Sequence, residues 1–233
     1  ASGGRALDQG KPVTGVAGAR VAVLDYEMSN LRSAVKALEM VGARVRVARA
    51  PGEAAGADAV VLPGVGHFGE AMRRIRAAGL DRAVRAARDE GVPVLGICLG
   101  LQLLFDESEE APGVAGLGLI PGGVRRLRTD RKVPHIGWSR VRWAPGAPLA
   151  PPGDDPAGST YYFVHSFGCV PADPALVQGT ADHGVEFCAA AGDAAVAGVQ
   201  FHPEKSSGAG IGLLGRWLAG VGAARDPGAA TAP

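Results

Sequence analysis

The stretch that decides the fold is residues 92–105, VPVLGICLGLQLLF. Residues 92–97 form a continuous apolar run, which is typical of a strand buried on both faces of a parallel sheet, and residues 99–105 begin an apolar helix. Gly96 and Gly100 flank Cys98 because a Cβ next to the cysteine would obstruct so tight a turn. The turn therefore lifts the Cys98 sulfur above the sheet, at a helix N-terminus that favours a thiolate.

Strand and helix patterns alternate upstream of this turn. Residues 21–25 and 59–62 are apolar strands, and residues 44–47 alternate valine with arginine, as in a strand nearer a sheet edge. Apolar spacing predicts helices at about residues 30–41, 70–78 and 80–90. Strands that alternate with helices indicate a mainly parallel sheet.

The sequence pattern changes beyond about residue 113, where short β-rich runs replace the alternation of strands and helices. These runs are residues 123–127, 133–143, 161–164, 176–181, 185–190 and 196–201, and a last helix is predicted at about residues 211–219. We therefore predict an α/β fold, with a mainly parallel sheet flanked by helices and antiparallel β elements added in the C-terminal half. We expect one domain, residues 20–222, between a flexible N-terminal extension (1–19) and a flexible C-terminal tail (223–233).

Composition and charge bound the class of protein. The chain has 233 residues, of which 47% are hydrophobic, so it can bury a substantial core. Its net charge of +1 gives no reason to expect nucleic acid or a membrane as partner. The odd count of 3 cysteines, and the lack of any signal-like or membrane-spanning apolar run, predict a soluble protein of the reducing cytoplasm.

A second motif supplies a chemical partner for Cys98. Residues 199–204, VQFHPE, form an apolar strand that ends in His202, Pro203 and Glu204. A thiol nucleophile needs an imidazole to take and return its proton, and the imidazole needs a polar group to fix its tautomer. Alone, Cys98 is more simply a packed core residue and His202 a structural one. Together, the two motifs predict a catalytic set of Cys98, His202 and Glu204.

A third motif, Pro63-Gly64-Val65-Gly66, also follows a predicted strand. Attack on an amide carbonyl creates an oxyanion, which backbone N–H groups can stabilise. We expect one donor from Leu99 and the second from Gly64 or Val65, although the motif alone could be an ordinary tight turn. The histidines lack zinc spacing, and we expect His67 and His183 in exposed loops.

These motifs resemble the class I (triad) glutamine amidotransferase family over residues 21–219, and within it the glutaminase subunits of imidazole glycerol phosphate synthase. The narrower resemblance rests on Asp25-Tyr26 and on residues 30–33 (NLRS), 62–66 (LPGVG), 134–138 (PHIGW), 162–166 (YFVHS) and 202–207 (HPEKSS). It implies a flavodoxin-like fold, hydrolysis of L-glutamine through a Cys98 thioester, and no cofactor or metal. It also assigns glutamine-binding roles to five residues: Gly66, Gln102, Glu110, Ser166 and Phe167.

The resemblance further implies a heterodimer with a (β/α)₈-barrel cyclase subunit. The cyclase would use the channelled ammonia to make imidazole glycerol phosphate and an aminoimidazole carboxamide ribonucleotide. We expect Trp138, Lys205 and Tyr162 at the interface, since tryptophan often anchors interfaces and Lys205 directly follows Glu204. We also predict that residues 63–66 are a gate that presents or withdraws the second oxyanion donor. A Gly64→Pro change is then expected to abolish stimulation by the partner and leave folding largely intact.

The chain departs from the family pattern at Glu27, Ser29, Ser139 and Phe167, none of which belongs to the predicted triad. Three alternatives stay open. The first is a glutaminase domain that serves anthranilate, aminodeoxychorismate or pyridoxal phosphate synthesis. The second is a different hydrolase or peptidase on the same scaffold, and the third is a binding subunit that has lost the chemistry.

Overall fold

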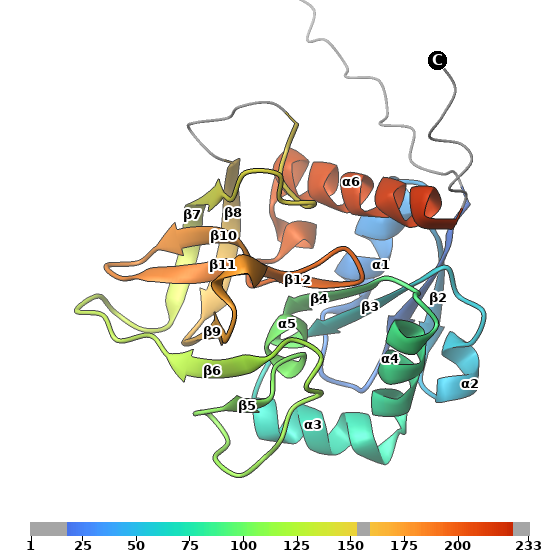
Figure 1. Cartoon of the computed structure of the whole chain (residues 1–233), viewed down its shortest axis with the longest axis horizontal. Helices are drawn as coiled ribbons and strands as arrows, with labels where there is room; N and C mark the ends of the chain where they lie inside the picture. Colours follow the sequence, from blue (N-terminus) through green and yellow to red (C-terminus); the bar gives the residue numbers. More distant parts are fainter. Residues whose placement is uncertain (1–17, 153–158, 226–233) are drawn as a thin grey trace, which may run out of the picture.

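The structure, a computed structural model, describes residues 18–152 and 159–225 of the chain (Figure 1). The expected N-terminal extension lies outside the described residues except for Gly18 and Ala19, and so do residues 226–233 of the expected tail. Within the described residues, no helix combines the length and the apolar character that a membrane span requires.

The core of the fold is a parallel sheet with strand order β2, β1, β3, β4, β12. The strands are β1 (Arg20–Leu24), β2 (Arg44–Ala48), β3 (Ala59–Gly64), β4 (Val94–Cys98) and β12 (Val196–Val199). β3 and β4 are buried along their whole length, whereas the alternating β2 lies at the sheet edge, as predicted. The predicted α/β class is confirmed, and the order is that of flavodoxin-like folds.

Helices cover both faces of this sheet (Figure 1). α1 (Leu31–Met40) and α6 (Ser207–Arg225) share a core with Val21 and Val23 of β1. α2 (Pro51–Ala54), α3 (Phe68–Ala77), α4 (Leu80–Asp89) and α5 (Leu99–Leu103) share the other core with Ala22 and Leu24. Successive residues of β1 therefore enter opposite cores, which explains the unbroken apolar run of this strand.

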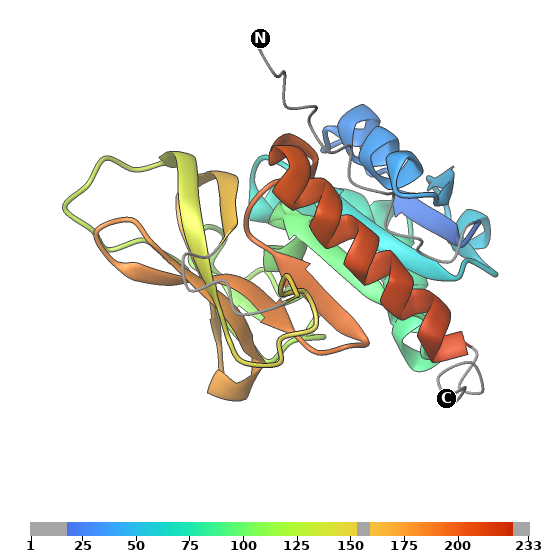
Figure 2. The same cartoon turned by 90° about the horizontal axis from the view of Figure 1, so that it is seen from above.

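An antiparallel part continues the sheet beyond β12 and stands to one side of the helices in Figure 2. It comprises β11 (Glu186–Gly192), β10 (Val177–Asp182), β7 (His135–Trp143) and β8 (Ser159–His165). β9 (Phe167–Pro171) pairs with β11 and with β6 (Gly122–Arg126), and β6 pairs with β5 (Glu107–Ser108). The turn η1 (Pro174–Leu176) leads from β9 into β10. The antiparallel addition expected in the C-terminal half is thus present.

Some elements differ from the sequence prediction for identifiable reasons. β5 and α2 were missed because they are only 2 and 4 residues long, and β9 because Ser166 alone separates it from β8. α6 is longer than the expected residues 211–219, and the expected domain boundary at residue 222 falls inside it. Glycines disfavour this helix, but its wholly buried Leu213, Leu214 and Leu218 outweigh local propensity.

Candidate active site

Cys98 occupies the strained turn that its flanking glycines predicted. It ends β4 with φ 55° and ψ −110°, a backbone conformation that non-glycine residues rarely adopt. A Cβ on Gly100 would lie 1.7 Å from the Leu62 carbonyl oxygen, and one on Gly96 would lie 2.7 Å from the Leu101 nitrogen. Only glycine therefore fits at either position, and the packing of α5 against β3 and β4 holds Cys98 in this conformation.

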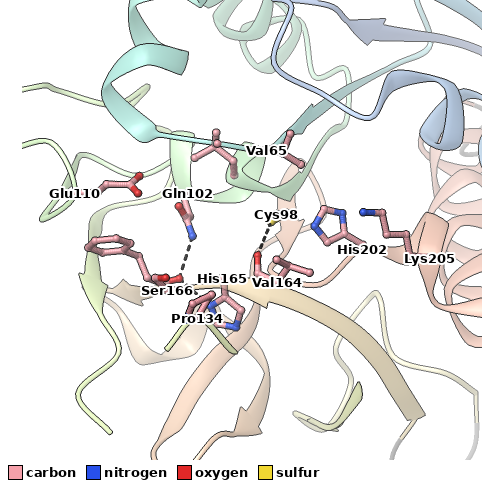
Figure 3. A pocket seen from close by; sticks show the side chains of 13 residues that line it. Val65, Cys98, Gln102, Glu110, Pro134, Val164, His165, Ser166, His202 and Lys205 are labelled. Atoms are coloured by element: carbon pink, nitrogen blue, oxygen red, sulfur yellow. Dashed lines mark hydrogen bonds between the residues drawn. The ribbon is translucent and has the colours of Figure 1, made fainter. Parts of the chain in front are cut away.

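His202 and Glu204 reach the same site from the end of β12. His202 precedes the short turn η2 (Pro203–Lys205), and its Nδ1 lies 2.8 Å from Glu204 Oε1. Burial lowers the pKa of His202, but hydrogen bonds to Cys98 and Glu204 outweigh it and raise the pKa to about 9. Figure 3 shows the Cys98 and His202 side chains next to each other. The arrangement can transfer a proton between sulfur and imidazole while Glu204 orients the ring.

The oxyanion motif lies beside the nucleophile, with one of its expected donors turned away. Gly64 ends β3 and pairs with Cys98 across the ladder, so residues 63–66 lie next to the nucleophile as predicted. The N–H of Val65, however, donates to the Met28 carbonyl oxygen at 2.9 Å. In this conformation the Val65 N–H, one of the two candidates for the second donor, is therefore engaged outside the oxyanion site. Leu99, the other expected donor, is the first residue of α5, where helix N–H groups lack intrahelical acceptors.

The expectation that Gly64→Pro leaves folding intact is wrong. A Cβ on Gly64 would lie 2.0 Å from the Tyr26 hydroxyl oxygen, and Tyr26 is only 2% exposed. The site has no room for even one additional carbon atom, because Tyr26 is packed beneath β3. Residue 64 thus needs glycine for close approach, and a proline there would disturb the strand itself.

A cavity of about 290 Å³ lies next to the nucleophile. It is lined by Cys98 and His202, and also by every residue that was expected to contact glutamine: Gly66, Gln102, Glu110, Ser166 and Phe167. Pro134, Val164 and His165 also line the cavity, although no role in the site was expected for them. Pro134 and His165 belong to the stretches PHIGW and YFVHS, which supported the family resemblance but did not by themselves indicate a role for either residue.

The polar groups of the cavity are suited to an amino acid. Gln102 uses its Nε2 to donate to the Phe167 carbonyl at 3.0 Å and to Gln200 Oε1 at 3.1 Å, which leaves its own amide oxygen as an acceptor. Glu110 accepts the N–H of Phe68 at 2.7 Å through one carboxylate oxygen. An amide oxygen and a carboxylate at one end of the cavity can together hold an ammonium group.

Of the residues expected at a partner interface, Lys205 lines the cavity, the Tyr162 carbonyl accepts the N–H of His202 at 2.9 Å, and Trp138 pairs with Tyr162 across β7 and β8. Trp138 is 53% exposed, and its ring contacts that of Tyr162 edge to face at 5.8 Å. The neighbouring Ile136 is 61% exposed, and Lys205 is exposed where it lines the cavity. Exposed apolar side chains such as Trp138 and Ile136 are typical of a surface that a partner covers.

The histidine expectations had mixed outcomes. His67 is exposed and accepts the N–H of Gly69 at 3.1 Å, which caps α3. His183 lies in the loop between β10 and β11, as expected, but it is half-buried rather than exposed. Its ring stacks on that of His135 at 4.2 Å and its Nε2 donates to the Lys132 carbonyl oxygen at 2.9 Å. Among residues 18–152 and 159–225, no group of three or more histidine, cysteine or acidic side chains could hold a metal ion.

Comparisons with known proteins bear on this site. The family model described as glutamine amidotransferase class-I matches residues 22–214. The chain is 49% identical over 195 residues to the imidazole glycerol phosphate synthase subunit HisH of Moorella thermoacetica, covering 83% of this chain and 91% of that one. It is 44% identical to the subunit of the same name from Synechococcus sp. (strain JA-3-3Ab), covering 84% of this chain and 91% of that one.

Solved structures are similar in fold. The crystal structure of a glutamine amidotransferase superposes with a TM-score of 0.68 at 22% identity, covering 86% of this chain and 98% of that one. The structure of PurLQS from Thermotoga maritima gives a TM-score of 0.67 at 21% identity, covering 85% of this chain and 97% of that one.

Proposed function

The chain belongs to the class I glutamine amidotransferase family, and we infer that it is the glutaminase subunit of an imidazole glycerol phosphate synthase. It hydrolyses L-glutamine to glutamate and ammonia and delivers the ammonia to a cyclase partner. The observation that carries the proposal is the juxtaposition of Cys98, His202 and the polar groups Gln102 and Glu110 around one cavity.

The chemistry follows from the proton positions in this site. Hydrogen bonds to Cys98 and Glu204 raise the pKa of His202 to about 9, so the imidazole can accept the proton of Cys98 and leave a thiolate. The thiolate attacks the side-chain carbonyl of glutamine, and His202 returns the proton to the departing ammonia. His202 then removes a proton from water, which cleaves the γ-glutamyl thioester and releases glutamate with Cys98 as the thiol. Glu204 keeps the imidazole oriented in both half-reactions.

Glutamine is oriented by groups at the far end of the cavity. Its α-ammonium is held by the free amide oxygen of Gln102 and by the carboxylate of Glu110. Its α-carboxylate is held by backbone near Ser166 and Phe167. Gly66, with φ 105°, lets the chain pass close to the substrate at the cavity wall.

Residues 63–66 regulate the reaction as a gate. The Val65 N–H donates to Met28 rather than to the site, so this donor is withdrawn from the oxyanion that forms from glutamine. Loss of one oxyanion donor typically costs about 2.7–4 kcal/mol, or about 10²–10³ in rate. Rotation of the peptide between Gly64 and Val65 restores the second donor, and partner binding next to Trp138 and Lys205 drives that rotation.

The partner is the cyclase subunit of the same synthase, and the two proteins work as a heterodimer in the cytoplasm. The cyclase combines the ammonia with a phosphoribulosyl formimino carboxamide nucleotide. Its products are imidazole glycerol phosphate and an aminoimidazole carboxamide ribonucleotide. Relatives that cover most of this chain and carry the name of that synthase subunit support this choice over other amidotransferase pathways.

The decisive experiment measures glutamine hydrolysis with and without the cyclase and its nucleotide. We expect low activity alone and strong stimulation by that cyclase, and none by anthranilate or aminodeoxychorismate synthases. A Cys98→Ala variant should lose glutamine-dependent synthesis and retain synthesis from ammonium. Cys188→Ala, which removes a buried free cysteine elsewhere, is the matched control and should keep both activities. Continued use of glutamine by Cys98→Ala contradicts the assignment of the nucleophile.

A further inference from the structure

Gln200 is a wholly buried glutamine directly behind the nucleophile. It has 0% exposure and follows β12, two positions before His202. A buried amide without hydrogen-bond partners destabilises the fold, so the partners of Gln200 must be identified. Its Nε2 lies 3.8 Å from the Cys98 sulfur, and its Oε1 lies 3.1 Å from Gln102 Nε2.

The orientation of the Gln200 amide is dictated by its neighbours. The Phe167 carbonyl can only accept, so the Gln102 atom 3.0 Å away from it must be the NH₂ group. The second N–H of the same group then points at Gln200, which must present its oxygen there. The Gln200 NH₂ group is thereby turned towards the Cys98 sulfur, where it acts as a donor.

Two buried histidines fix which atoms donate and which accept at the end of this hydrogen-bond network that lies away from Cys98. The Phe167 carbonyl also accepts from His165 Nδ1 at 2.9 Å, so His165 Nε2 must accept from His135 Nδ1 at 3.2 Å. His135 Nε2 in turn accepts from the Ser139 hydroxyl at 3.0 Å. Burial lowers the pKa of His165 to about 3 and that of His135 to about 4, so both rings stay neutral at physiological pH.

The Cys98 sulfur has different partners in its two protonation states. As a thiol it donates to the Val164 carbonyl oxygen at 3.8 Å. As a thiolate it only accepts, and the Gln200 N–H remains as a donor after the proton has moved to His202. A donor that bonds to the charged form stabilises that form.

We propose that Gln200 is a further catalytic residue of this site, which stabilises the Cys98 thiolate and connects it to Gln102 on the glutamine-binding side. The proposal deepens the glutaminase function and rests on it for its biological meaning. Occupation of the Gln102 oxygen by the substrate ammonium polarises the same amide that donates to Gln200. Substrate binding therefore strengthens the donor at the nucleophile.

The test is the pH profile of Cys98 alkylation by iodoacetamide in the isolated subunit, with labelling of each cysteine followed by mass spectrometry. Gln200→Met keeps the side-chain length and removes the donor. Loss of a hydrogen bond to a charged group should shift the midpoint upward by about one pH unit and slow alkylation at neutral pH about tenfold. An unchanged midpoint in a folded Gln200→Met protein overturns the proposal.

Gln178→Met is the matched control. Gln178 is also buried, at 4% exposure, and its Nε2 donates to the Gly192 carbonyl at 3.0 Å on β11. It should melt at a lower temperature than the parent with an unchanged alkylation midpoint. If Gln200→Met does not fold, Gln200→Leu, which also lacks the donor and adds no charge beside the sulfur, takes its place with the same expected shift. An unshifted midpoint there equally overturns the proposal.

The alkylation readout needs neither glutamine turnover nor the cyclase, so it is separable from the function itself. Adding glutamine to the wild-type protein should slow Cys98 alkylation. A lack of protection contradicts the proposed function and leaves the Gln200 measurement meaningful. Protection by glutamine together with an unshifted midpoint in Gln200→Met supports the proposed function and overturns the role proposed for Gln200.

Discussion

Gly64 packs tightly against the Tyr26 side chain beside the nucleophile, and Gly64→Ala tests this contact. The added Cβ would lie 2.0 Å from the Tyr26 hydroxyl oxygen, but 3.2 Å from Leu99 Cβ and 3.3 Å from the Gly100 nitrogen. Tyr26 is 2% exposed and cannot move into solvent. Overpacking of this kind costs about 1–3 kcal/mol, and 2 kcal/mol lowers Tm by about 4–8 °C in a domain of this size.

A double-mutant cycle isolates the contact. Within the described residues the Tyr26 hydroxyl has no hydrogen-bond partner, so Tyr26→Phe should be neutral or stabilising. With the hydroxyl gone, the remaining contacts of Gly64→Ala need shifts of only a few tenths of an ångström. We therefore expect the cost of Gly64→Ala to fall below about 1 kcal/mol in the Tyr26→Phe background, which is a coupling of at least about 1 kcal/mol.

The assay is urea and thermal unfolding of the four proteins of the cycle. Gly52→Ala is the control, because a Cβ there meets open space and alanine favours the helix α2. It should be neutral or slightly stabilising. An equal loss of stability from Gly64→Ala with and without the Tyr26 hydroxyl would refute the reasoning.

Two further predictions concern the partner face and the buried histidines. Trp138→Ala should change Tm by less than about 2 °C, because the ring is 53% exposed, and should weaken cyclase binding in calorimetry at least about tenfold. The control is Met40→Ala, at a side chain that is 73% exposed, which should change neither Tm nor binding. Burial holds the pKa of His165 at about 3, below its unfolded value of about 6.5, so the unfolded chain binds more protons as the pH falls. The unfolding free energy in urea should therefore drop below pH 6.5, by about 2 kcal/mol at pH 5 from His165 alone, and a His165→Asn variant should lose less. The raised pKa of His202 affects stability in a different pH range. Its contribution to the unfolding free energy is complete below pH 6.5 and is lost as the pH rises through about 9.

Local signals predicted the parts of the fold that depend on local physics. The apolar run and the glycines around Cys98 predicted a strand, a tight turn and a helix, because only glycine can approach the Leu62 carbonyl so closely. The alternation of β2 likewise predicted a sheet edge. The pairing of Cys98 with His202 was also predictable, since each stands at the carboxyl end of a strand and such ends meet at one edge of a parallel sheet.

Contacts between segments that are distant in the chain were not predictable. Gln200 looked like one polar residue within a strand, and its role depends on Gln102 and Cys98. The donation of the Val65 N–H to Met28 depends on how the loop after β1 turns, which no local pattern specifies. The burial of His183 was misjudged for the same reason, because the β7 residue against which it packs lies far from it in the chain.

The two sides of the cavity differ in how firmly they are held. The sulfur side depends on a buried network in which each amide and ring has a partner, so displacing Gln200 would leave several buried groups unpaired. On the oxyanion side, the N–H of Val65, a residue that is 38% exposed, makes a backbone hydrogen bond to the Met28 carbonyl oxygen. The loop that contains Met28 also carries the surface ion pair of Glu27 with Arg74. Such a bond is worth about 0.5–1.5 kcal/mol net and such an ion pair about 0–1 kcal/mol. The Val65 peptide is therefore held by weaker interactions than the nucleophile, and this difference supports the proposal that partner binding turns that peptide while Cys98 stays in place.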